Sequence, residues 1–139
     1  MTIPDIIKAR NCGLVRITYS GDSVNIKANH YPEFGLKGGF KDLLKIDFDK
    51  AKSIVAALLY KDLAYNSELM SLERAESYTD FLFDPFSEKD CLCYTNGNWN
   101  EYHNATSGSW TPMTEATFDG GVIILSLGLS LCFWVEDED

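Results

Sequence analysis

Two cysteines and a histidine are the residues of this sequence whose types and spacing come closest to a chemical site. Cys91 and Cys93 form a C-x-C pair, and a tight turn at Asn96-Gly97 sets His103 on the opposite strand of a hairpin. A structural zinc site takes four ligands, usually with C-x-x-C spacing, so another cysteine would have to complete the set. Burial in a hydrophobic core explains two cysteines on one strand face more simply. We therefore expect no metal site and no cofactor.

The other polar residues show no pattern that is typical of catalysis. The two histidines, His30 and His103, lie at unrelated places in the sequence. The glycine-rich segment GLKGGFK, residues 35–41, lacks the Lys-Ser/Thr end of a P-loop and follows no clear strand, so it is interpreted as a plain loop. The sequence has no G-x-S-x-G, H-E-x-x-H or dinucleotide-binding motif. We therefore predict a protein that is not an enzyme, and no catalytic residue is assigned.

The whole chain has a net charge of −9, and the negative charge is concentrated in its C-terminal half. Residues 1–74 carry 11 lysines and arginines and 9 acids, whereas residues 75–139 carry one lysine, Lys89, and 12 acids. Such a surface repels nucleic acid and anionic membranes and attracts basic proteins. Charge that serves only solubility is the alternative. The four acids at the chain end, residues 136–139, repel one another and are expected to be solvated.

Length and hydropathy define the class of protein. At 139 residues and 45% hydrophobic composition, we expect one domain, residues 1–139, with a substantial core. The first ten residues lack the apolar stretch of a signal peptide. The longest apolar run, residues 120–135, is interrupted by serines and glycines and is shorter than a membrane span. A cytoplasmic protein with four reduced cysteines is therefore expected.

The C-terminal segment shows the most regular apolar pattern and is expected to organise the sheet. A two-residue turn at Gly128-Leu129 sets Ile124 opposite Phe133 and Val122 opposite Val135. Both faces of the resulting ribbon are apolar. This pattern predicts that the ribbon lies in the middle of a sheet that is covered on both sides.

Two further hairpins are predicted. Residues 14–20 and 23–29 flank a type II′ turn at Gly21-Asp22, with Val15, Ile17 and Tyr19 on the core face. Residues 90–95 and 99–104 flank an Asn-Gly-Asn turn whose register is ambiguous, because a two-residue turn pairs Tyr94 with Trp99 and a longer turn does not. Residues 44–48 alternate in hydrophobicity and predict a short additional strand.

Helical periodicity predicts two helices in the middle of the chain. One covers residues 50–65 with Asp49 as its N-cap, and the other begins at Asn66 or Ser67 and ends before Asp84-Pro85. A short helical segment near Pro4 precedes the first strand. The fold class is therefore α+β, with a mostly antiparallel sheet of about six or seven strands and the two central helices packed on one face.

The C-terminal third resembles a family of bacterial toxin inhibitors. The segments WTPMTEATFDGGVII, residues 110–124, and CFWVEDED, residues 132–139, are similar to small immunity proteins of contact-dependent growth inhibition systems. The resemblance implies a cytosolic, non-enzymatic protein that binds one cognate toxin domain and blocks it. That toxin is often a nuclease with a basic active-site cleft. The resemblance supplies no catalytic residues.

Aromatic side chains and acids alternate between residues 99 and 119, where we predict the partner-binding surface. Aromatic anchors surrounded by charge are typical of protein–protein interfaces, and core packing is the alternative for each tryptophan. Two other functions are kept: an acidic nucleic-acid mimic that inhibits a DNA- or RNA-binding protein, and a small α+β enzyme with a concave pocket. The predicted partner-binding residues are Trp99, Glu101, Tyr102, Trp110, Glu115 and Asp119.

Overall fold

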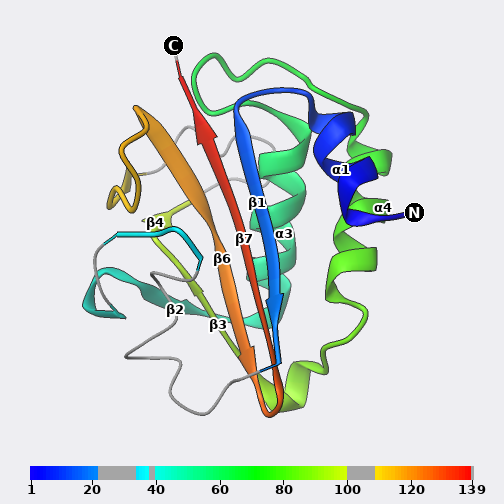
Figure 1. The fold of residues 1–139 in the computed structure, drawn as a ribbon, viewed down its shortest axis with the longest axis vertical. Helices are drawn as coiled ribbons and strands as arrows, with labels where there is room; N and C mark the ends of the chain where they lie inside the picture. Colours follow the sequence, from blue (N-terminus) through cyan, green and yellow to red (C-terminus); the bar gives the residue numbers. More distant parts are fainter. Residues whose placement is uncertain (22–33, 38–39, 100–108, 139) are drawn as a thin grey trace.

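A computed structural model describes residues 1–21, 34–37, 40–99 and 109–138, and they form an α+β fold (Figure 1). Helices α1, α3 and α4 lie on one face of an antiparallel five-stranded sheet with the order β1-β7-β6-β3-β2. The fold class and the packing of the two central helices on one face are confirmed. The helices are α1 (Ile3–Arg10), α3 (Phe48–Tyr60) and α4 (Leu72–Phe83), with short 3-10 turns η1 (Phe40–Asp42) and η2 (Glu88–Asp90). The strands of the sheet are β1 (Leu14–Ser20), β2 (Leu44–Ile46), β3 (Cys91–Thr95), β6 (Phe118–Ser126) and β7 (Leu129–Asp137).

Two further strands, β4 (Gly97–Asn98) and β5 (Ser109–Trp110), form a separate two-stranded ribbon. The prediction of six or seven strands in one sheet is therefore corrected to five plus two for the described residues. The chain leaves the large sheet after β3 because the side chain of Asn96 donates hydrogen bonds to the backbone of Thr111 (2.9 Å) and to Asp119 (3.0 Å). These bonds hold the start of the small ribbon against β6.

Strands β6 and β7 form the covered centre of the sheet, as the sequence predicts. Val122, Ile124 and Phe133 face the helices, whereas Ile123 and Trp134 face a second apolar cluster on the other side. This second cluster is completed by side chains from outside the strands, namely Phe34, Leu36, Leu43 and Met113. Both faces of the central ribbon are therefore buried.

The register of this ribbon differs from the prediction by two residues. Ser126 pairs with Leu129, and Ile124 pairs with Leu131 rather than with Phe133. The turn is therefore Leu127-Gly128, with Gly128 second at φ +84°, a position that favours glycine in a type II turn. A shift of two residues leaves every side chain on its own face, so the predicted burial holds.

Gly128→Ala should lower the free energy of unfolding by about 1 kcal/mol, because an alanine is strained at this positive φ although nothing lies within 4 Å of its Cβ. Gly21 is the matched control, since its Cβ also meets no atom of the described residues within 4 Å and its φ is not in the positive range. Gly21→Ala should change the free energy of unfolding by less than about 0.5 kcal/mol. Chemical denaturation measures both values, and equal losses would contradict the Leu127-Gly128 turn.

Strand β1 is confirmed at residues 14–20 and pairs with β7 along its whole length. Val15 is buried, and Ile17 and Tyr19 pack against the helix-side core, as predicted. The predicted partner strand, residues 23–29, lies outside the described residues. Gly21 lacks the positive φ that a type II′ turn requires at its first position, so this turn type is wrong.

The predicted hairpin of residues 90–104 is wrong in its pairing. Both edges of β3 are occupied, one by β6 and the other by β2, so Tyr94 pairs with Ile123 and Lys45 rather than with Trp99. The Asn-Gly signal was local, whereas pairing with the buried ribbon buries more apolar surface. Residues 100–108 lie outside the described part of the chain.

The helices begin and end at residues that explain their bounds. Thr2 and Asp5 form a capping box at α1. The N-cap of α3 is Asp47, two residues before the predicted Asp49, and its carboxylate accepts from the amide of Lys50 at 2.7 Å. The helix ends at Tyr60 instead of near residue 65, because Asp62 binds the amides of a tight turn. Helix α4 begins later than predicted.

A buried ion pair joins the two ends of the chain. Arg10 donates from both terminal nitrogens to the carboxylate of Asp137, at 2.9 and 2.8 Å, and from Nε to the carbonyl of Leu58 at 2.8 Å. The same carboxylate accepts from the amide of Leu63 at 2.8 Å. The expectation that residues 136–139 are all solvated is therefore wrong for Asp137, which stabilises the contact between α1, α3 and β7.

Candidate protein-interaction surface

The acids of residues 75–139 divide into buried and exposed groups. Asp119 and Asp137 are buried, and Glu136 is partly buried in an ion pair with Arg16 at 2.8 Å. These three carboxylates are therefore bound by hydrogen bonds or ion pairs within the fold. Exposed acids lie close together in sequence on α4 and η2, and they are Glu76, Asp80, Asp84, Glu88 and Asp90. This group is named the α4 acidic surface.

Helix α4 presents these acids because its two faces differ in composition. Ser71 caps its N-terminus, accepting from the amide of Arg74 at 3.1 Å, and Pro85 cannot continue the helix because it has no N–H. The core-facing side packs through apolar contacts, and the hydroxyl of Thr79 donates within the helix to the carbonyl of Ala75 at 2.8 Å. The residues buried on that side are Ala75, Tyr78, Thr79, Leu82 and Phe83.

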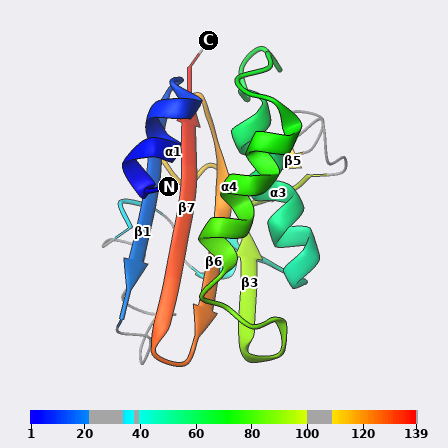
Figure 2. The same cartoon turned by 90° about the vertical axis from the view of Figure 1, so that its right-hand side faces the viewer.

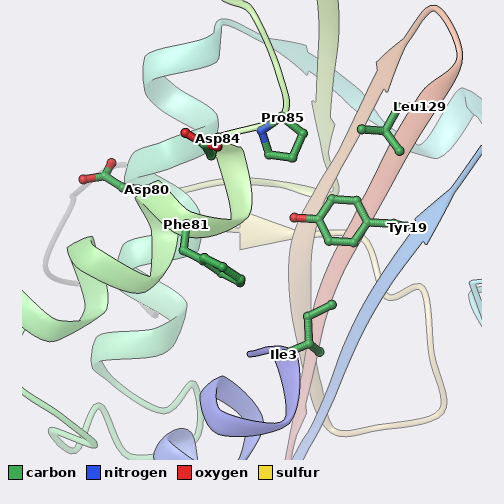
Figure 3. Close-up of a pocket in the computed structure, with 7 residues that line it drawn as sticks. All are labelled: Ile3, Tyr19, Asp80, Phe81, Asp84, Pro85 and Leu129. Carbon is green, nitrogen blue, oxygen red and sulfur yellow. The ribbon is translucent and has the colours of Figure 1, made fainter. Parts of the chain in front are cut away.

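A groove of about 600 Å³ opens beside the α4 acidic surface (Figure 3). Figure 3 shows Phe81, Tyr19 and Ile3 projecting toward the same space from α4, β1 and α1. Asp80 and Asp84 are the charged residues that line the groove. The apolar lining residues are Ile3, Tyr19, Phe81, Pro85 and Leu129.

The groove exists because the helices leave part of the sheet uncovered. In Figure 2, α1 lies over one end of β1 and β7, while α3 and α4 lie toward β6 and β3. Tyr19 and Leu129 lie near the other end of these strands, where only Ile3, at the start of α1, lines the same groove. Because no helix covers this end of the strands completely, the side chains there line a groove.

Tyr19 holds the floor of the groove in place. Its hydroxyl donates to the carbonyl of Leu82 at 2.6 Å, and its ring stacks on Phe86 with centroids 6.3 Å apart. Burial, with a smaller contribution from Asp84, raises the pKa of Tyr19 to about 12. The phenol therefore stays neutral at physiological pH, and it joins β1 to the end of α4.

The two acids of the groove differ in their partners. The carboxylate of Asp80 forms an ion pair with Lys52 of α3 at 2.9 Å, and Figure 3 shows it pointing away from Tyr19 and Ile3. The carboxylate of Asp84 makes no hydrogen bond or ion pair with any residue in the described ranges. Among the described residues that line the groove, Asp84 is therefore the acid without an ion-pair partner.

Asp119 does not lie on a surface, in contrast to its predicted role. It has no exposed area, and its carboxylate accepts hydrogen bonds from Asn96, Trp134, the amide of Met113, and both the amide and the hydroxyl of Thr114. This burial excludes a direct contact between Asp119 and a partner. The residue instead holds the segment that precedes β6.

The predicted aromatic residues Trp99 and Trp110 lie together, but only the second is partly exposed. Their rings stack with centroids 6.0 Å apart, and Trp110 also contacts Phe118. These three rings, with Leu63 and Ala64, line a second cavity of about 280 Å³. Trp99 is buried and donates from Nε1 to Thr95 at 3.0 Å, so core packing is the role that its position supports.

Of the remaining predicted residues, the structure describes only Glu115. Glu115 is exposed and forms an ion pair with Lys37, on the opposite side of the sheet from the helices. Glu101 and Tyr102 lie outside the described residues. The groove residues Ile3, Tyr19, Phe81, Asp84 and Leu129 were absent from the prediction because they come from distant parts of the sequence.

The cysteine and acidic side chains in the described ranges are not clustered as a metal site, since no three of them lie together as metal ligands do. Both histidines lie in ranges that the structure does not describe. Burial raises the pKa of Cys93 to about 12 and also raises the pKa of Cys12, Cys91 and Cys132. Protonated thiols are weak nucleophiles and weak metal ligands at neutral pH.

We predict that all four cysteines are reduced and metal-free in the folded protein. Native mass spectrometry should therefore give the mass of the bare chain, and iodoacetamide should add four groups after denaturation. In the folded protein, Cys93 and Cys132 should react much more slowly than an exposed thiol, because they are buried. A mass lower by four hydrogens, or one that includes zinc, would refute this prediction.

No helix in the described ranges combines the length and apolar composition that a membrane crossing requires. Comparison with protein-family models, with curated proteins and with solved structures found no match to this chain. The α4 acidic surface and its groove are therefore the features from which a function is proposed.

Proposed function

We propose that this protein is a cytoplasmic immunity protein that neutralises a bacterial toxin by binding a basic toxin domain. The observation that carries the proposal is the α4 acidic surface, whose exposed carboxylates lie beside an apolar groove. A toxin that binds nucleic acid needs a cleft rich in lysine and arginine. Carboxylates that occupy such a cleft block the sites of the phosphates. Attraction between the two surfaces raises the association rate by roughly 10- to 1,000-fold.

The apolar groove favours recognition of one protein over general mimicry of nucleic acid. A nucleic-acid mimic needs regularly spaced carboxylates. Glu76, Asp80 and Asp84 form a row of this kind, because residues four apart in a helix are separated by about 6 Å along its axis. Phe81 places an exposed aromatic ring beside this row, and Asp80 is already paired with Lys52. An exposed aromatic ring surrounded by charge is typical of a specific protein interface.

The direct test uses the toxin domain that the gene immediately upstream encodes, since an immunity protein is expected to follow its toxin. Co-expression of this protein should restore the growth of cells that produce the toxin. A toxin domain inactivated at its active site should co-purify with this protein. The proposal fails if growth is not restored and no complex forms.

The association rate between this protein and the toxin domain should fall steeply as salt rises from about 0.05 M to about 0.5 M. The reason is that the exposed acids act on the partner before contact, and salt screens them. Stopped-flow fluorescence measures this rate, and the dissociation rate should change much less. An association rate that is independent of salt would contradict the electrostatic part of the proposal.

A further inference from the structure

The groove of Figure 3 has a chemistry that identifies the part of the partner it accepts. We infer that it binds one apolar side chain of the partner, while an adjacent arginine or lysine of the partner pairs with Asp84. The identity of the partner rests on the proposed function. The chemistry of the groove does not, so the two can be tested separately.

The apolar half of the inference rests on the lining of the groove. Its walls come from α1, β1, α4, β7 and the turn after α4, and Phe81 on α4 is 39% exposed. A volume of about 600 Å³ exceeds that of a single leucine or phenylalanine side chain, so the groove also admits neighbouring atoms of the segment that carries it. Apolar side chains that fill such a pocket are typical binding anchors.

The charged half of the inference rests on the difference between two acids on one helix. Asp80 and Asp84 both line the groove, but the charge of Asp80 is compensated by Lys52. The hydroxyl of Tyr19 already donates a hydrogen bond to the carbonyl of Leu82. Asp84 is therefore the lining group that gains most from an incoming cation.

The groove is also held in shape before any partner binds. The bond from Tyr19 to Leu82 and the stacking on Phe86 tie β1 to α4, and Pro85 restricts the chain after the helix. A preformed site loses little conformational entropy on binding. This favours recognition of a short segment without rearrangement.

A neighbouring hollow sets the direction of the bound segment. This second hollow, of about 470 Å³, lies farther along the seam between α1 and α4 and is lined by Asp5, Lys8 and Arg74 among others. Its charges are mixed, with two cations against one acid. A basic side chain of the partner is therefore directed to the Asp84 end of the seam and away from Lys8 and Arg74.

Capped tripeptides test the groove without the toxin. Arginine-leucine-arginine, titrated to about 5 mM, should shift the amide NMR signals of Ile3, Phe81 and Leu129 in a saturable manner. Arginine-glycine-arginine and glutamate-leucine-glutamate are the matched controls, and each should shift these signals less than about a third as far. The inference is overturned if the first peptide has no effect, or if either control acts as strongly as the first.

Variants test the same groove in the toxin complex. Phe81→Ala and Asp84→Asn should each raise the dissociation constant by about tenfold or more. Asp80→Asn, on the same helix, and Leu127→Ala, an exposed leucine at the β6–β7 turn, should raise it by less than about threefold. All four variants should melt within a few degrees of the wild type, because each altered side chain is exposed.

The two tests separate the possible failures. If the wild-type protein does not bind the toxin domain, the proposed function fails and the tripeptides still decide the groove. If the toxin binds but Asp80→Asn weakens binding as much as Asp84→Asn, the assignment of Asp84 is overturned. If Phe81→Ala weakens binding no more than Leu127→Ala, the apolar anchor is overturned.

Discussion

Replacing Arg10 with methionine should lower the free energy of unfolding by about 3 to 5 kcal/mol, because it leaves a buried carboxylate without its counter-charge. The carboxylate of Asp137 has 1% exposure, and among the described residues it keeps only the amide of Leu63 and the distant thiol of Cys12 as donors after this change. The carbonyl of Leu58 also loses its bond from Arg10. Urea denaturation measures the difference.

Arg16→Met is the matched control for this experiment. Arg16 also pairs with an acid of β7, Glu136, at 2.8 Å, but its side chain is 32% exposed. Water then replaces the lost partner, and the expected cost is under about 1 kcal/mol. Comparable losses for the Arg10 and Arg16 variants would contradict the role assigned to the buried pair.

Asp119→Ala should lower the free energy of unfolding by about 3 kcal/mol or more, because several buried donors lose their acceptor together. They include the indole of Trp134 at 3.2 Å and the amides of Met113 and Thr114, both at 3.1 Å. Asp119→Asn keeps the size but turns an NH₂ group toward some of these donors, so it should also destabilise the fold. Thermal unfolding measures both variants.

Glu115→Ala is the control for Asp119. The Glu115 side chain is 82% exposed, and its ion pair with Lys37 lies at the surface, so the stability should change by less than about 0.5 kcal/mol. Loss of stability in the Glu115 variant equal to that in the Asp119 variant would contradict the buried network. A binding defect of Asp119→Ala would report unfolding rather than a lost contact.

The parts of the fold that show a periodic pattern of apolar residues could be predicted from the sequence. Alternation identified the two faces of β1, and the doubly apolar pattern of β6 and β7 correctly placed them at the covered centre. The register of that ribbon was missed by two residues because the faces do not distinguish the two pairings. The position of Gly128 in the turn decides between them.

The interaction surface depends on contacts that the sequence does not display. In the sequence, Asp119 cannot be distinguished from an exposed acid beside a turn. In the structure, Asn96 and Trp134 pack against its carboxylate and donate hydrogen bonds to it, so it is a buried acceptor. Phe81 was the one residue whose position could have indicated the groove, because it is aromatic but lies outside the apolar stripe of α4. Its partners in the groove, Ile3 and Leu129, are brought there by the pairing of distant strands and by α1.

Amide hydrogen exchange on the complex with the inactivated toxin domain tests the central claim most directly. If the toxin binds at the α4 acidic surface and its groove, exchange should slow in peptides covering residues 72–90, and in those containing Ile3 and Leu129. The segment of residues 109–119, around Trp110 and Glu115, should exchange as in the free protein. Protection confined to residues 109–119, with residues 72–90 unchanged, would contradict the account.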